Sequence, residues 1–355
     1  MNRHDVNVIS EDCIFDCRRD EFHFLTVIIP TYKLVSFLIQ TVDSLVAQCN
    51  KHFEVVVVDN DFGNICGLDQ TLMSYRDKLA IALFRNPKNL GMFGNWDRGI
   101  ELSRTKWVTI LHDDDLFAPS FISDASHVIA ETPSLELLLF RVNTFYGEDN
   151  PLNARAEPAL PVGIQGLRNA LLNDTIYKLS LVDYFFKNEH TGTLGAVFIR
   201  QNALALNGVN RFFEKYGYVS DFAFFVEYCR RYHSTFLYNH PAAYYRFHIN
   251  ESLKYEVILS FIDYCKIIRS EILEEYGFKG RCGTMLNAMV TAYQIKASSG
   301  LKCPEYIANL IPYVIRHHGL TRLSYELYQI VVRVIYNLAQ LRRVCSRRIK
   351  CPRSN

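Results

Sequence analysis

The feature that most constrains the fold is a series of short apolar segments that recurs along the first third of the chain. Apolar and β-branched residues dominate positions 24–30, 53–59, 81–84 and 107–111. Continuous apolar strands of this kind are typical of a parallel sheet that is buried on both faces. Helical spacing predicts helices between them, at about 34–48, 67–79 and 93–104. This alternation predicts right-handed βαβ units and a Rossmann-like α/β sheet.

The later parts of the chain differ in pattern. Residues 135–140 predict one more strand, and several prolines and glycines between 147 and 165 predict a loop. Positions 191–250 favour mixed strands and short helices, and the pattern from about 255 to 345 is helical. We expect an N-terminal tail at 1–22 and a main domain at 23–252, with halves at about 23–145 and 146–252. A helical C-terminal region at 253–355 completes the chain.

Composition indicates a folded protein of the cytoplasm. Hydrophobic residues make up 49% of the 355 positions, enough for a large core. No apolar run reaches the roughly 18 residues of a membrane span. Positions 1–21 are polar, unlike a signal peptide. The ten cysteines show no C-x-x-C spacing, so we expect reduced thiols rather than a zinc site or a disulfide framework.

The net charge of +2 conceals a basic C-terminal region. Residues 281–355 contain 12 Lys and Arg against two acids, which gives +10, so the first 280 residues carry −8. Apolar residues at helical spacing between 323 and 344 predict an amphipathic helix that leads into several arginines. Such a helix can bind an anionic membrane, and the alternative is a helix packed on the body with a solvated basic end. No nucleic-acid-binding module is recognisable, so we expect no nucleic-acid partner.

Polar residues follow each of the four predicted strands, at the point where the strand ends. In chain order they are Pro30, Thr31 and Tyr32; Asp59, Asn60 and Asp61; Arg85 and Asn86; and His112, Asp113, Asp114 and Asp115. The carboxyl ends of parallel strands meet at one edge of a sheet, and open α/β sheets bind their ligands there. We therefore expect these side chains to line a single crevice.

The three adjacent aspartates, Asp113, Asp114 and Asp115, are the most specific feature of this edge. Neighbouring carboxylates repel one another unless a cation lies among them, and oxygen ligands suit Mg²⁺ or Mn²⁺. Protein-bound Mg²⁺ usually completes its coordination with phosphate oxygens and water, so a diphosphate would fit this site. The alternative is a solvated acidic turn that caps the helix predicted after Pro119.

The ordered set of motifs resembles the family 2 glycosyltransferases of GT-A fold. Besides the strand ends, the resemblance rests on Asn89-Leu-Gly91 and Asn95, and it covers about residues 24–145. It resumes weakly over residues 191–252 and is absent beyond about 255. The resemblance implies a mixed, mostly parallel sheet flanked by helices. It also implies transfer of a sugar from a nucleotide-sugar, most commonly a UDP-sugar, with inversion at the anomeric carbon.

The resemblance also assigns roles to individual residues. Those expected to bind the donor are Pro30, Thr31, Tyr32, Asp59, Asp61, Arg85, Asn89, Gly91, Asn95, Asp113 and Asp114. In the family's D-x-D signature, Asp113 and Asp115 would be the metal ligands. The longer pattern L-D-x-D-D instead puts His112 at its first acid and the next two aspartates, Asp114 and Asp115, at its last two. The resemblance leaves open which carboxylate contacts the metal and which the ribose.

Two further residues are assigned in the second half of the chain. Asp221 occupies the position of the family's catalytic base, at the start of a helix predicted at 221–231 that Ser220 could cap. The alternative is that Asp221 only complements the helix dipole, and Glu227 and Glu214 are weaker candidates for the base. His248, in the stretch 245–248, resembles a family histidine that adds a third metal ligand in some relatives, although a lone histidine is more often structural.

Together these features favour a metal-dependent inverting hexosyltransferase. Its acceptor would be a carbohydrate or a lipid-linked oligosaccharide, as in bacterial O-antigen or capsule synthesis, at the inner face of the cell membrane. One alternative is a nucleotidyltransferase on a similar sheet, but the loop at 30–35 lacks the glycines that such enzymes usually have there. The other alternative, a catalytically silent carbohydrate-binding protein, would not need the intact acids at 113–115 and 221.

Overall fold

The computed structural model describes residues 12–18, 23–63, 67–147, 176–179, 192–247 and 255–277, with isolated positions at 181, 184, 280, 284 and 287. The chain forms two compact units, which are described separately below. The first comprises Met1–Leu181 with Glu189–Glu251, and the second comprises Val182–Asn188 with Ser252–Asn355. The sheet and the candidate site both belong to the first unit.

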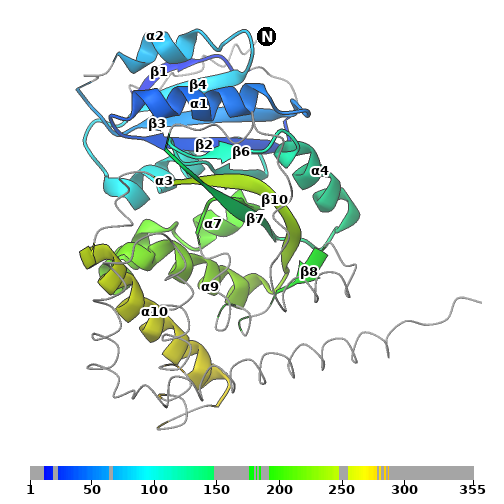
Figure 1. The fold of residues 1–355 in the computed structure, drawn as a ribbon, viewed down its shortest axis with the longest axis vertical. Helices are drawn as coiled ribbons and strands as arrows, with labels where there is room; N and C mark the ends of the chain where they lie inside the picture. Colours follow the sequence, from blue (N-terminus) through cyan, green and yellow to red (C-terminus); the bar gives the residue numbers. More distant parts are fainter. Residues whose placement is uncertain are drawn as a thin grey trace, which may run out of the picture. The chain divides into compact units, whose positions relative to one another are not determined.

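A mixed sheet organises the first unit (Figure 1). Its ten strands within the described residues are β1 Cys13–Asp16, β2 Leu25–Thr31, β3 Phe53–Asp59, β4 Ala80–Arg85, β5 Trp107–Ile110, β6 Leu116–Phe117, β7 Leu137–Tyr146, β8 Ile176–Lys178, β9 Ala196–Ile199 and β10 Thr235–Phe247. They lie in the order β1-β4-β3-β2-β5-β9-β7-β10-β6, and β8 pairs with β10. The four strands predicted first, β2 to β5, pair in parallel.

Helices cover both faces of this sheet. In the first unit they are α1 Val35–Val46, α2 Leu68–Met73, α3 Gly91–Leu102, α4 Phe121–Glu131, α7 Arg200–Ala205, α8 Phe213–Tyr216 and α9 Ser220–Tyr232, with 3₁₀ turns η1 Asn210–Phe212 and η2 Gly217–Val219. Successive strand residues point to opposite faces. Val27 of β2 thus packs in a core with Leu38 of α1. Its neighbour Ile28 lies against Gly99 of α3. The predicted α/β architecture, with a largely parallel sheet flanked by helices, is confirmed.

Two strands extend the sheet beyond the sequence-based expectation. β1 lies inside the predicted tail at 1–22, where it pairs antiparallel with β4 and so forms the edge of the sheet. β9 inserts between β5 and β7 and runs antiparallel to both. This insertion brings the second half of the chain directly beside the strand that precedes the acidic residues 112–115.

One helix was predicted to be longer than it is. α2 ends at Met73, and residues 74–79 form turns instead of continuing the helix to 79. Tyr75 and Leu79 lie in these turns, and the side chains of both are buried. In this stretch the apolar residues therefore mark buried positions and do not indicate a helical backbone.

The second unit contains α10, Tyr255–Glu275. Its buried residues include Cys265, Ile268 and Ile272. Arg269 is also buried and donates from Nε to Asn287 Oδ1 at 3.1 Å. Among the described residues, no helix combines the length and hydropathy that a membrane crossing requires. The amphipathic helix predicted at 323–344 lies outside the described residues.

Candidate active site

A shallow, open hollow lies at the carboxyl ends of β2 and β3. Its lining consists of Thr31, Lys33, Leu34, Val35, Asp59, Asp61 and Leu68. The strand register places Thr31 beside Asp59, and Asp59 beside Arg85 of β4. Three of the predicted donor-binding residues, Thr31, Asp59 and Asp61, therefore share one surface depression.

Asp59 and Arg85 form an ion pair beside this hollow. Arg85 Nε donates to Asp59 Oδ2 at 2.9 Å, and the guanidinium also pairs with Asp69. The backbone N–H of Asp61 donates to Asp59 Oδ1 at 2.9 Å. Burial raises the pKa of Asp59 despite these bonds, which favour its charged form. Asp59 and Arg85 thus hold each other in place at the strand ends.

An asparagine network supports the loop that leads into α3. Asn60 Nδ2 donates to Asn89 Oδ1 at 2.9 Å, and Asn86 Nδ2 donates to Asn95 Oδ1 at 2.8 Å. Asn95 Nδ2 in turn donates to the carbonyl of Val58 at 3.0 Å. Asn95 is buried, whereas Asn89 is exposed. The buried side chain of Asn95 therefore holds the end of β3, which carries Asp59, in place.

The acidic loop follows β5, and Asp113 connects it to β2. Asp113 Oδ2 accepts a hydrogen bond from Thr31 Oγ1 at 2.7 Å and a longer one from the Tyr32 N–H at 3.3 Å. Burial raises the pKa of Asp113 to about 7 despite the bond from Thr31, and the charge of Asp114 adds to the rise. The structure therefore brings Asp113 and the predicted nucleotide-binding residue Thr31 into direct contact.

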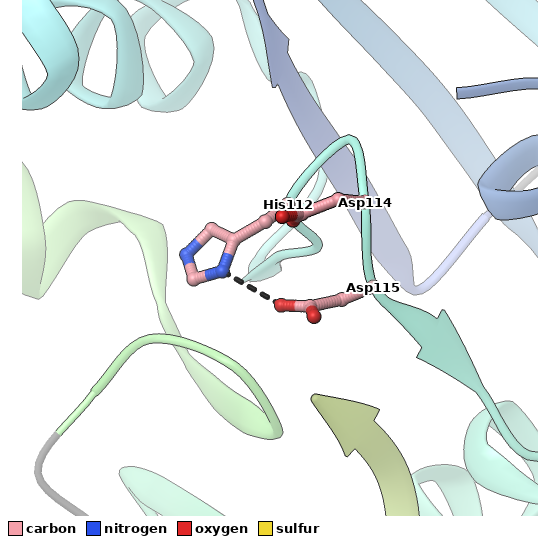
Figure 2. Close-up of side chains that lie close together, drawn as sticks. All are labelled: His112, Asp114 and Asp115. Atoms are coloured by element: carbon pink, nitrogen blue, oxygen red, sulfur yellow. Dashed lines mark hydrogen bonds and ion pairs between the residues drawn. The ribbon is translucent and has the colours of Figure 1, made fainter. Parts of the chain in front are cut away.

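Asp115 points the other way, into the protein. It is fully buried, and its Oδ1 accepts the backbone N–H of Arg246 at 2.8 Å. Its Oδ2 lies 2.9 Å from His112 Nδ1, the interaction drawn in Figure 2. Burial raises the pKa of Asp115, and the charge of Asp114 acts in the same direction.

His112 links the acidic loop to the second half of the chain. Its Nε2 lies 3.0 Å from Thr193 Oγ1, and its ring stacks on Trp96 at 5.3 Å between centroids. Burial alone would lower the pKa of His112, but the hydrogen bond to Asp115 and the neighbouring carboxylates raise it to about 9. At neutral pH His112 is therefore a cation that donates from both ring nitrogens.

The acidic loop has the donor set of a divalent-cation site. His112, Asp114 and Asp115 each offer one ligand atom, and these atoms lie within 4.8 Å of one another (Figure 2). Burial is the main cause of the raised pKa values of Asp113 and Asp115, and the charge of Asp114 adds to both. A cation among the three carboxylates would stabilise their charged forms. Carboxylate oxygens fit Mg²⁺ or Mn²⁺. His112 can act as a ligand only after it loses its proton, so Asp114 and Asp115 are the ligand candidates of this cluster at neutral pH. His248 lies outside the described residues.

Arg246 of β10 belongs to the stretch 245–248, which resembles the family's Arg-x-His ending, but the sequence analysis assigned a role only to His248. Its fully buried guanidinium lies 4.5 Å from the rings of Phe37 and Phe145. It donates to the carbonyls of Asp114 at 2.6 Å and Gly147 at 2.7 Å, and also to Gln40 Oε1 at 2.8 Å. Arg246 thereby fixes the backbone of the acidic loop. The aromatic residues around position 246 were the available signal for a buried arginine.

Asp221 lies in the first turn of α9. The capping prediction for Ser220 was wrong, because its hydroxyl donates to the carbonyl of Gly217 at 2.6 Å and no side chain caps this helix. Asp221 Oδ1 accepts the N–H of Phe222 at 2.8 Å, and burial raises the pKa of Asp221 to about 7. Among the described residues, no basic side chain forms an ion pair with it. A Cβ added at Gly192 would lie 3.4 Å from Asp221 Oδ2, so this glycine leaves room beside the carboxylate.

The weaker candidates for a base are placed differently. Glu227 pairs with Arg230 at 2.5 Å, one turn along the same helix. Glu214 is exposed on α8. Asp221 is the carboxylate whose surroundings suit proton transfer near neutral pH.

Comparisons with known proteins find similarity to glycosyltransferases. Residues 26–150 match a model of the family described as glycosyl transferase family 2. The chain is 25% identical to an uncharacterized glycosyltransferase of Haemophilus influenzae over 32% of its length, and 32% identical to one of Mycoplasma genitalium over 28%. It is 28% identical over 52% of its length to TarS, a poly(ribitol-phosphate) β-N-acetylglucosaminyltransferase of Staphylococcus aureus. The matches span 37%, 35% and 33% of these relatives' own lengths, so the chain covers about a third of each.

One solved structure with the same fold is that of S. aureus TarS residues 1–349 in complex with UDP-GlcNAc. It superposes with a TM-score of 0.54 at 17% identity, covering 78% of this chain and 74% of that one. A second structure of the same fragment gives a TM-score of 0.52. The predicted GT-A fold is thereby confirmed.

Proposed function

Because residues 26–150 place the chain in glycosyl transferase family 2, we propose that it is a metal-dependent, inverting hexosyltransferase. One observation carries this proposal, namely a short path of contacts from the nucleotide side to the proposed base. Thr31 bonds to Asp113 on the acidic loop. Two positions further on, Asp115 bonds through His112 to Thr193, whose neighbour Gly192 lies beside Asp221.

We propose that the hollow beside Thr31 and Asp59 binds the nucleoside of a UDP-sugar. Carboxylate and hydroxyl groups at this edge can accept and donate hydrogen bonds to a base and a ribose. The half-exposed ring of Tyr32, next to Thr31, offers a surface on which a base can stack. The TarS fragment of similar fold was solved with UDP-GlcNAc, which supports UDP as the nucleotide. Pro30, Asp61, Arg85, Asn89 and Gly91 complete the proposed donor site.

The acidic loop would hold Mg²⁺ or Mn²⁺. The cluster of His112, Asp114 and Asp115 favours the register in which Asp114 and Asp115 are ligands, and the D-x-D register, with Asp113, shares Asp115. His248 remains a proposed third ligand. A bound ion would supply Lewis-acid stabilisation of the leaving diphosphate. The protein itself fixes the loop through Arg246 and places the His112 cation beside the carboxylates.

Asp221 is the proposed general base. It would take the proton of an acceptor hydroxyl as that oxygen forms a bond to the anomeric carbon. In the same step the bond from the anomeric carbon to the diphosphate oxygen breaks, and UDP leaves with that electron pair. A single displacement inverts the anomeric configuration, and a positioned base typically contributes about 10²- to 10⁴-fold. The raised pKa of Asp221 matches this role, since a base is most effective near the working pH.

The acceptor is proposed to be a carbohydrate or a lipid-linked oligosaccharide. A role in bacterial surface polysaccharide synthesis, such as O-antigen or capsule, would suit an enzyme at the inner face of the cell membrane. The basic region at 281–355 supports this proposal, because lysines and arginines attract anionic lipid. TarS, whose name records transfer onto a poly(ribitol-phosphate), is a relative that acts on a polymer.

A donor panel tests the proposal. The full chain is incubated with UDP- and GDP-sugars and a mixture of saccharide acceptors, with Mn²⁺ and with EDTA. We expect release of UDP that EDTA stops, and NMR of the product should show a β-linkage from an α-linked donor. Retention of configuration would contradict the single displacement. In a parallel reaction with added pyrophosphate, formation of UTP and a sugar 1-phosphate from the UDP-sugar would indicate a nucleotidyltransferase. Binding of the donor without turnover would indicate a catalytically silent protein.

A further inference from the structure

Five rings form a continuous series of contacts that leads away from the acidic loop. His112 stacks on Trp96 at 5.3 Å, and Trp96 meets the ring of Phe93 edge-on at 5.0 Å. Phe93 contacts Phe213 at 5.7 Å, and Phe213 meets Tyr218 edge-on at 6.0 Å. Phe93 and Trp96 are buried, whereas Phe213 and Tyr218 are 45% and 47% exposed. The series therefore begins in the proposed active site and ends in an exposed aromatic pair.

The exposed pair lies on the segment that leads directly into the proposed base. Phe213 begins α8, Tyr218 is the middle residue of η2, and Asp221 follows three positions later in α9. The hydroxyl of Ser220 donates to the carbonyl of Gly217 and so holds the turn that carries Tyr218. The pair is thus anchored at two points, by Phe93 beneath Phe213 and by the turn that precedes Asp221.

The chemistry of this pair suits a neutral sugar ring. A pyranose presents a face of C–H groups that packs on an aromatic ring, while its hydroxyls stay free for hydrogen bonds. Phe213 and Tyr218 offer such a face, because both rings are exposed and Tyr218 lies three positions before the proposed base Asp221. A phosphate-bearing acceptor would instead favour free basic groups. The basic side chains of this segment, Arg211 and Lys215, lie over the rings of Phe212 and Tyr216 rather than over those of Phe213 and Tyr218.

We propose that Phe213 and Tyr218 form an acceptor subsite that binds the apolar face of a pyranose ring, so that the acceptor is a neutral saccharide. This inference rests on the proposed function, because it places the subsite next to Asp221 as the base. It also narrows that function, since it selects a sugar ring over a polyol phosphate as the group that receives the transferred sugar.

Saturation-transfer NMR on the full chain tests the subsite without turnover. The probes are the methyl β-D-pyranosides of glucose, galactose, mannose and N-acetylglucosamine, together with ribitol 5-phosphate. We expect saturation of the ring protons of at least one pyranoside and its loss in a variant that combines Phe213→Ala with Tyr218→Ala. Ile14→Ala removes a similarly exposed apolar side chain from the edge strand β1 and should leave the signal unchanged.

Kinetics with the pyranoside that responds most strongly give a second readout. Each single alanine variant should raise the acceptor KM about tenfold, equivalent to about 1.4 kcal/mol. Phe213→Tyr and Tyr218→Phe keep the ring and should stay within about twofold of the parent. Calorimetric binding of UDP should be the same in all variants, which shows that the donor side is intact.

The outcomes separate this inference from the proposed function. Pyranoside binding that depends on the two rings, without sugar transfer from any donor, would contradict the proposed function alone. Sugar transfer whose acceptor KM is the same in both alanine variants would overturn the subsite alone. Binding and use of ribitol 5-phosphate in preference to every pyranoside would also overturn it.

Discussion

The surroundings of Asp221 explain why this residue suits the proposed reaction. An ordinary aspartate has a pKa of about 4 and is a weak base at neutral pH. Burial raises the pKa of Asp221 to about 7, and no basic side chain among the described residues pairs with the carboxylate. Gly192 leaves space beside its second oxygen. By contrast, the carboxylate of Glu227, on the same helix, forms an ion pair with Arg230.

The pH dependence of the reaction should report this carboxylate. Asp221 must be deprotonated to accept a proton, so kcat/KM should fall about tenfold per pH unit below about pH 7 and level off above it. Asp221→Asn should lower kcat by about 10²- to 10⁴-fold while calorimetric binding of UDP stays within about twofold. A pH profile that is flat through neutrality, or loss of UDP binding in Asp221→Asn, would indicate a structural role instead.

Arg246 should contribute strongly to the stability of the fold, because its guanidinium donates to three buried acceptors. Arg246→Met leaves the carbonyls of Asp114 and Gly147 and the amide oxygen of Gln40 without their buried donor. We expect the free energy of unfolding to fall by about 3 kcal/mol or more, measured by urea denaturation. Arg76→Met, which removes an exposed arginine, should change it by less than about 0.5 kcal/mol. Equal effects of the two substitutions would contradict the proposed support of the acidic loop.

At the scale of elements, local pattern determined what the sequence could predict. The strands β2 to β5 were predicted to within about two residues at each end, because their apolar runs are continuous and bounded by polar or proline residues. The order of the strands could not be predicted beyond the βαβ series. β9 is a four-residue strand whose position between β5 and β7 depends on pairing with partners distant in sequence.

Some contacts of the candidate site could likewise be predicted from the sequence, and others could not. Thr31 and Asp113 are 82 residues apart, yet their contact follows from a simple rule, since both lie at the carboxyl ends of the parallel strands β2 and β5. The contact of His112 with Thr193 spans a similar distance but depends on where β9 inserts. The bond from Arg246 to Asp115 spans 131 residues and depends on the position of β10. No local pattern encodes these two placements.

The packing of α3 on the sheet makes a prediction at this scale. A Cβ at Gly99 would lie 2.2 Å from Ile28 Cγ2 of β2, so Gly99→Ala forces the helix and strand apart. We expect a loss of about 1–3 kcal/mol in the free energy of unfolding. Ile28→Ala removes the obstructing atom, so the double variant should lose less than the sum of the two single variants in a double-mutant cycle. Additive losses would show that α3 does not approach β2 so closely.

At the scale of the whole molecule, a single sheet joins the two halves of the proposed active site. The first half of the domain contributes β2 to β5, and the second half adds β9 directly beside β5. This continuity explains how residues from both halves reach the acidic loop. The charge is distributed unevenly along the chain, with −8 in the first 280 residues and +10 in the last 75. A mildly acidic body can bind a diphosphate only where a cation or local donors offset its charge.

The central claim is that the acidic loop and a divalent ion together bind the diphosphate of a nucleotide. Calorimetric titration of UDP into the full chain, with Mn²⁺ or with EDTA, tests it most directly. We expect EDTA to weaken binding at least about tenfold, and Asp114→Asn to do the same in the presence of Mn²⁺. Asp77→Asn, at an exposed acid outside the loop, should have no effect. UDP affinity that is unchanged by EDTA and by Asp114→Asn would contradict the account.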